Sequence, residues 1–187
     1  MINRLLGSFE AISKRLVWLG GIMLIGAAFL VTIDVFARKF LNISLAGSDE
    51  LSGYAFGMST SLAFAYALLS RANIRVDAFY HLFPRWGRVA SDIIGLALLL
   101  GFIGLIAYLG FNLLTDSFFH GSRSITPLRT PLAIPQTVWW LGLAFALLTG
   151  LLILVASLHA VFRKDWATIQ RLVGVKSVDE QIDEETA

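Results

Sequence analysis

The sequence predicts an all-α integral membrane protein with four transmembrane helices. Three observations lead to this prediction: a high hydrophobic content, four long runs without a charged residue, and positive charge that alternates between the two ends of those runs. Hydrophobic residues fill 57% of the 187 positions and charged residues only 15%, against about 25% in typical soluble domains. A soluble domain of this length could not bury so much apolar surface, so we expect a membrane to cover it.

Four runs without Asp, Glu, Lys or Arg define the spans. Each approaches or exceeds the ~20 residues that a helix needs to cross a hydrocarbon core of ~30 Å. The fourth run, 130–162, is too long for one upright helix, and Pro131 and Pro135 predict that its helix starts near Pro135, because proline favours the first helical turn. With their flanking residues, the predicted spans are about 16–37, 49–70, 88–115 and 135–162.

An N-terminal segment, residues 1–15, precedes the 16–163 transmembrane domain. Its apolar residues Ile2, Leu5, Phe9 and Ile12 recur at helical spacing, which predicts a short amphipathic helix on the membrane surface. The first span is long enough to anchor the chain, and no A-x-A-like cleavage site follows a short apolar region. We therefore expect this span to be retained and not to be removed as a signal peptide.

The distribution of lysine and arginine predicts the orientation. Eleven of the 15 fall before the first span, between the second and third, or after the fourth, and four fall in the other two connections. Positive residues concentrate on the cytoplasmic side, so we expect both termini in the cytoplasm of a bacterial cell and a multi-pass inner-membrane protein. The C-terminal segment, 164–187, ends in "SVDEQIDEETA", which we expect to be an acidic, solvated cytoplasmic tail.

Few side chains offer chemistry. The chain has no cysteine, and the centres of the predicted spans contain no Asp, Glu, Lys, Arg or His. Metal-ligand spacings, nucleotide-binding loops and paired catalytic carboxylates are missing from the sequence, and no basic face with interleaved aromatic residues indicates nucleic acid. We predict no catalytic, cofactor-binding or metal site, and a protein that is not an enzyme.

One face of the second span carries a small residue at every fourth position. A stripe of this kind lets another helix backbone approach closely in a membrane. Packing within the four-helix bundle and docking to a separate membrane protein both explain it. The stripe consists of Gly53, Gly57, Ser61 and Ala65, and Gly142, Ala146 and Gly150 repeat it more weakly in the fourth span.

Charged residues gather at the span ends, often four apart. Such pairs form ion pairs along a helix, worth only about 0.2–0.5 kcal/mol each, or contact a partner subunit. The pairs are Asp34 with Arg38, Arg88 with Asp92, and Asp116 with His120.

The second span begins with a capping pattern. Ser48 is placed to cap the helix, and Asp49 and Glu50 lie in its first turn, where the helix dipole favours negative charge. The alternative is that Glu50 binds a cation on a neighbouring protein at a subunit interface.

A polar stretch, "SRANIRVDAFYHLFP", joins the second and third spans at residues 70–84. Asp77 is placed to cap a short interfacial helix that runs through Phe83, with Pro84 starting the next element. The alternative is that Arg75 or Asp77 contacts a partner subunit.

Three segments resemble the small (Q-type, DctQ-like) permease subunit of tripartite ATP-independent periplasmic (TRAP) transporters. "DVFARKFLNISLAGSDELSGYAF" is similar to the connection between that family's first two helices. "RANIRVDAFY" resembles its I-x-V-D signature, and "PLRTPLAIPQTVWWLG" resembles the start of its fourth helix. With the length and the four spans, the resemblance covers nearly the whole chain.

The resemblance implies two protein partners. A large (M-type) permease subunit binds the substrate and the coupling sodium ions, and a soluble periplasmic binding protein delivers the substrate, usually an organic acid. The small subunit packs against the static scaffold of the large one, and membrane lipids are expected at the seam. On this basis Glu50, Arg75, Asp77 and the small-residue stripe are candidate subunit contacts, and Arg123 and Arg129 are candidates for docking the binding protein.

Two other functions fit a small membrane protein without buried charge. One is a membrane assembly or regulatory subunit of another complex. The other is a small homo-oligomeric exporter, although a proton-coupled exporter acting alone needs a carboxylate within the membrane, and the predicted span centres contain none.

Overall fold

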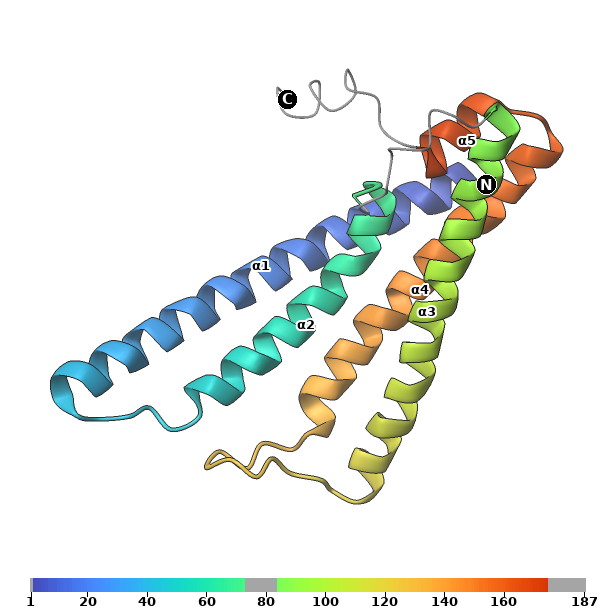
Figure 1. The fold of residues 1–187 in the computed structure, drawn as a ribbon. Coiled ribbons are helices and arrows are strands. Elements are labelled where there is room, and N and C mark those ends of the chain that lie inside the picture. Colours follow the sequence, from blue (N-terminus) through green and yellow to red (C-terminus); the bar gives the residue numbers. More distant parts are fainter. Residues whose placement is uncertain (1, 73–83, 175–187) are drawn as a thin grey trace.

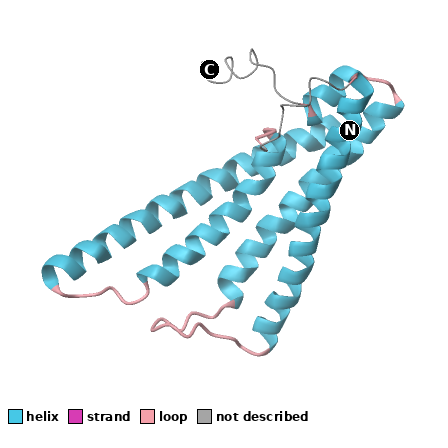
Figure 2. Ribbon diagram, in the orientation of Figure 1, coloured by secondary structure: helices cyan, strands magenta, loops and turns pink. Residues whose placement is uncertain are grey.

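The computed structural model describes residues 2–72 and 84–174. Within these ranges the secondary structure is helical, apart from one isolated backbone bridge between Arg123 and Pro131. The all-α prediction is therefore confirmed for the described residues (Figures 1 and 2). The helices are α1 (Ile2–Leu41), α2 (Ser48–Leu69), α3 (Arg85–Phe119), α4 (Ala133–Phe162) and α5 (Trp166–Val173).

The four long helices lie side by side in the order α1, α2, α4, α3. Helix α2 packs mainly against α1 and α4, and α4 packs against α2 and α3. The α1–α2 and α3–α4 pairs converge near the start of α1 and α5, and they diverge toward the connections 42–47 and 120–132 (Figure 1). We call these two ends of the molecule the terminal end and the loop end.

The hydrophobic core is concentrated toward the terminal end. Its buried residues come from the C-terminal half of α2, the N-terminal half of α3, α4 and α5, and Leu6 of α1 packs against them. Large apolar side chains of α1 and α3 face outward along most of their length, as lipid-facing side chains do. The buried core residues are Ala65, Leu68, Leu96, Leu100, Ala146, Ile153, Ala160, Ile169 and Val173.

Among the described residues, three helices are long and apolar enough to cross a membrane: α1 from Arg4 onward, α3 and α4. The fourth predicted span coincides with α2, whose 22 residues give a length of about 33 Å at 1.5 Å per residue. Glycines, hydroxyl side chains and two first-turn acids lower its hydropathy. Since α2 lies between two other helices, much of its surface faces protein and needs fewer large apolar residues. Its membrane crossing stays a prediction.

The N-terminal segment is helical, but it is not a separate helix. Helix α1 runs without a break from Ile2 to Leu41, because no proline lies in this range and the Ser13 hydroxyl donates to the Glu10 carbonyl of the preceding turn instead of capping a new helix. The Phe9 ring stacks on Phe145 of α4 with 5.2 Å between ring centroids. This contact ties the start of α1 to the middle of α4. The interfacial helix expected at 77–83 lies outside the described residues.

Helix α5 was not predicted from the sequence, which suggested only a tail from residue 164. Lys164 adopts a positive φ of 55° and turns the chain after α4. The Asp165 carboxylate then accepts hydrogen bonds from the Thr168 backbone N–H (3.1 Å) and hydroxyl (2.6 Å), which caps the helix. Ile169 and Val173, four residues apart, enter the core. The fold therefore extends past the last predicted span.

Removing the buried side chain of α5 tests this extension. Ile169→Ala is expected to lower the free energy of unfolding by about 2–5 kcal/mol, because it leaves a cavity in the core. Thermal unfolding of the detergent-solubilised chain measures the change. Phe162→Ala is the control, since Phe162 is exposed and its loss leaves no cavity. Equal effects of the two substitutions would show that α5 does not dock on the core.

Candidate functional site

A buried aspartate organises the loop end. The Asp34 side chain is fully buried near the end of α1, and its Oδ1 accepts a hydrogen bond from the Leu45 backbone N–H at 2.7 Å. Its Oδ2 accepts hydrogen bonds from the Ser48 hydroxyl (2.7 Å) and from the Arg38 guanidinium. Asp34 therefore joins the end of α1, the 42–47 connection and the start of α2. The ion pair with Arg38 expected from the sequence is only one part of this arrangement.

The cap predicted at Ser48 is wrong. Helix α2 begins at Ser48, with Gly47 in the N-cap position and no side-chain cap hydrogen bond. The Ser48 hydroxyl donates to Asp34 instead. A buried carboxylate needs hydrogen-bond donors more than an exposed helix end does, because water can supply the helix end.

Glu50 links α2 to the connection between α3 and α4. Its Oε1 accepts a hydrogen bond from the Tyr54 hydroxyl at 2.8 Å, and its Oε2 accepts one from the Thr126 hydroxyl. Both carboxylate oxygens are thus bound within the chain. Asp49, the other first-turn acid, is exposed and lies 3.9 Å from Arg38. Of the two acids, Glu50 is the one that holds α2 to the connection between α3 and α4.

The chain from Ser122 to Leu132, which we call the 122–132 loop, is held by its own backbone. The Ser124 N–H donates to the Thr130 carbonyl (2.9 Å), and the Leu132 N–H donates to the Ser122 carbonyl (3.0 Å). The Thr126 N–H also donates to the Ser124 hydroxyl (3.1 Å). These bonds give the loop a defined shape without regular strands.

The 122–132 loop also contacts the α1–α2 connection. Leu128 fills the space where a side chain at Gly47 would lie, and Gly47 has a φ of 97°, which favours glycine. With the bond from Thr126 to Glu50, this contact joins the two diverging helix pairs at the loop end.

The small-residue stripe has two halves with different surroundings. Ser61 and Ala65 are buried, and a Cβ added to Gly142 of α4 would lie 2.6 Å from Ser61 Oγ and 2.7 Å from the Ser61 carbonyl carbon. The α2 and α4 backbones therefore touch here, as GxxxG-type packing requires. This half of the stripe serves packing within the chain.

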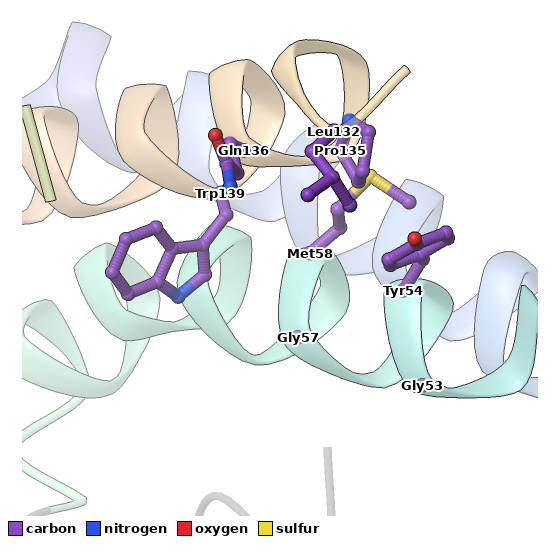
Figure 3. A pocket seen from close by; sticks show the side chains of 8 residues that line it. All are labelled: Gly53, Tyr54, Gly57, Met58, Leu132, Pro135, Gln136 and Trp139. Atoms are coloured by element: carbon purple, nitrogen blue, oxygen red, sulfur yellow. The ribbon is translucent and has the colours of Figure 1, made fainter. Parts of the chain in front are cut away.

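The other half of the stripe is open. A Cβ added to Gly53 or Gly57 would meet no atom within 4 Å. Both glycines line a pocket of about 160 Å³ between α2 and α4, which Figure 3 shows from close by and which we call the α2–α4 pocket. Its other lining residues are Tyr54, Met58, Leu132, Pro135, Gln136 and Trp139.

One polar atom at this pocket lacks a partner. The Oε1 atom of Gln136 is buried and accepts no hydrogen bond from the described residues. A buried acceptor left unpaired costs about 1–3 kcal/mol, so Gln136 offers a place for a donor from outside the chain.

A family model described as "Tripartite ATP-independent periplasmic transporters, DctQ component" matches residues 27–163. The chain belongs to this family. The resemblance seen in the three sequence segments is therefore confirmed, and the protein is a small membrane subunit of a TRAP transporter. No curated protein and no solved structure matches the chain.

The region shared with other DctQ components contains the loop-end contacts and the α2–α4 pocket, whereas α5 and the first 26 residues lie outside it. The family is a component of a transporter and not an enzyme family. Within residues 2–72 and 84–174, no group of three or more His, Cys, Asp or Glu side chains could hold a metal ion.

The structure places the described candidate residues of this DctQ subunit in four settings. Glu50 is bound within the chain, Gly53 and Gly57 are open, and Ser61 and Ala65 are buried. Arg123 and Arg129 are exposed on the 122–132 loop, where the Arg123 guanidinium donates to the Arg129 carbonyl at 3.3 Å. Arg75 and Asp77 lie outside the described residues.

Breaking the bond between Glu50 and Thr126 is expected to loosen the 122–132 loop. In Glu50→Gln the charged acceptor is lost, so the hydrogen bonds to the Tyr54 and Thr126 hydroxyls become neutral ones, which are about half as strong. Trypsin can cut this loop after Arg123 and Arg129. We expect cleavage there to become roughly tenfold faster, because a hydrogen bond to a charged group is worth about 1.5–3 kcal/mol.

Asp49→Asn provides the matched control for this measurement. It neutralises the adjacent acid, whose side chain is 88% exposed and lies near Arg38 of α1. Mass spectrometry of the fragments identifies the cut sites. If Glu50→Gln and Asp49→Asn are cut at the same rate, Glu50 does not hold the loop.

Proposed function

We propose that this subunit packs against the scaffold of a large permease subunit and stabilises it during sodium-driven uptake of an organic acid delivered by a periplasmic binding protein. The observation that carries the proposal is the open half of the α2 stripe, because the space beside both glycines is not filled by their own chain and suits a partner helix. Among the described residues, the buried charged side chains are Asp34 and Asp92, both near helix ends. A scaffold role needs no ion site at mid-membrane.

We also propose that all four long helices cross the bacterial inner membrane, with both termini in the cytoplasm and the loop end in the periplasm. The distribution of positive charge supports this orientation. An even number of crossings places both termini on one side, and both connections of the loop end then lie on the other.

The α2–α4 pocket is the proposed contact with the large subunit. A cavity of about 150 Å³ holds a molecule the size of benzene, so a pocket of about 160 Å³ suits one aromatic or branched side chain. An incoming side chain with a hydrogen-bond donor would also satisfy Gln136 Oε1. An acyl chain fills the space but supplies no donor.

The exposed 122–132 loop is the proposed docking surface for the binding protein, through Arg123 and Arg129. In the described part of the chain no acidic side chain pairs with either guanidinium, so both are free for an acidic partner. Arg75 and Asp77 remain proposed contacts with the large subunit on the cytoplasmic side, and membrane lipids are proposed partners at the subunit seam.

Filling the pocket tests the contact with the large subunit. Gly57→Leu places a side chain in the α2–α4 pocket and is expected to abolish co-purification with the large subunit. The thermal stability of the isolated subunit should change little, because nothing lies within 4 Å of a Cβ at this position.

Gly101→Leu is the control for Gly57→Leu. Gly101 is exposed on α3, and a Cβ there also meets no atom within 4 Å, so the complex should form as in the wild type. If Gly57→Leu also leaves assembly and uptake unchanged, the pocket is not the contact.

Neutralising the two loop arginines tests docking of the binding protein. Arg123→Gln with Arg129→Gln is expected to slow association of the binding protein with the two-subunit complex about tenfold or more at low salt, because opposite charges steer the encounter. The difference should shrink at high salt. Lys39→Gln, an exposed cation at the end of α1, is the control. Equal association rates for the double variant and the wild type at both salt concentrations would contradict the proposal.

A further inference from the structure

An isoleucine on the 122–132 loop is fully exposed. The relative accessibility of Ile125 is 104%, so its side chain contacts almost nothing in the chain. Its two neighbours are both held: the Ser124 N–H donates to the Thr130 carbonyl (2.9 Å), and the Thr126 hydroxyl donates to Glu50. The backbone therefore fixes an apolar side chain in an exposed position.

Exposed cations flank this side chain on both sides along the loop. The Arg123 guanidinium contacts the Arg129 carbonyl, and both arginine side chains are exposed. An apolar centre inside a polar rim is the usual arrangement of a protein–protein interface. Most of the binding free energy in such interfaces comes from a few side chains that become fully buried.

The loop is also fixed in advance of any contact. Leu128 packs at Gly47, and Thr126 binds Glu50, so α2 and the α1–α2 connection hold the loop in place. Binding to a surface that is already ordered avoids the entropic cost of ordering it. Burying one isoleucine side chain contributes about 1.5–3 kcal/mol, which corresponds to a factor of at least about ten in affinity.

We propose that Ile125 is the central apolar anchor by which this subunit docks the soluble binding protein. The complementary surface on that protein is an apolar depression with acidic residues around it. The inference rests on the proposed function, in which the binding protein docks on the 122–132 loop. In that docking Ile125 contributes most of the affinity, whereas Arg123 and Arg129 raise the rate of association.

Lipid is the other apolar environment that Ile125 could enter, and the structure favours the protein. Thr126, the next residue, binds the first turn of α2, which lies in the middle of the helix row and not at its edges. The loop is thereby held over the helix ends at the loop end, where a soluble partner approaches.

Replacing this side chain gives a quantitative test. The two-subunit complex is placed in nanodiscs of phosphatidylethanolamine and phosphatidylglycerol, and purified binding protein is titrated onto it. Ile125→Ser is expected to weaken the dissociation constant about tenfold or more, chiefly through faster dissociation. Co-purification with the large subunit should be unchanged.

Ile43→Ser is the matched control. Ile43 is an isoleucine in the other connection of the loop end, and its side chain is 58% exposed. Its replacement should leave the dissociation constant unchanged. Equal dissociation constants for Ile125→Ser and wild type, or equal losses for Ile125→Ser and Ile43→Ser, would overturn the assignment of Ile125.

A single label separates the binding protein from lipid. The chain has no cysteine, so Ile125→Cys can carry one polarity-sensitive fluorophore. The proposal predicts a polar emission in nanodiscs that shifts to the blue when binding protein is added. A blue emission without binding protein, unchanged by its addition, would show insertion into lipid and overturn the proposal. If the binding protein fails to bind even the wild-type complex, the proposed function itself is wrong.

Discussion

The contact between the α2 and α4 backbones at Ser61 and Gly142 is the constraint on which the rest of the structure depends. Lipid tails are as apolar as the helices, so no hydrophobic force drives two helices together in a membrane, and close packing must do so. Gly142 lacks the Cβ that would meet the Ser61 backbone. With these two helices in contact, α2 and α4 occupy the middle of the row, and α1 and α3 its edges.

The divergence of the two helix pairs away from this contact has consequences at the loop end. It leaves open space where a Cβ at Gly53 or Gly57 would lie and opens the α2–α4 pocket. The hydrogen bond from Thr126 to Glu50 and the contact of Leu128 with Gly47 compensate, because they join the two pairs through their connections instead of through packed helices. Asp34 holds the connection within the α1–α2 pair in place for these contacts. The terminal end of the molecule is therefore a packed hydrophobic core. The loop end is a polar surface held by hydrogen bonds, with the α2–α4 pocket beneath it. This division suits a subunit with one partner in the membrane and another in solution.

Much of the fold could be predicted from the sequence, because long apolar runs indicate membrane-spanning helices directly. The bounds of α3 and α4 lie within four residues of the predicted spans, and DctQ membership followed from short motifs that the family model confirms. The continuity of α1 and the presence of α5 were not predicted. Helix α5 has a signal in the sequence, since Asp165 and Thr168 form its cap and the spacing of Ile169 and Val173 gives it an apolar face.

The candidate site was harder to predict. Spacing places Gly53 to Ala65 on one face but cannot say which half meets α4, and nothing local links Glu50 to Thr126, 76 residues away.

The most direct test of this account is a structure of the DctQ subunit in complex with its large permease subunit in lipid. The account predicts a bulky side chain of the large subunit inside the α2–α4 pocket, in contact with Gly57 and within hydrogen-bond distance of Gln136. A complex in which lipid fills this pocket and the large subunit packs only against the α1 or α3 edge would contradict it.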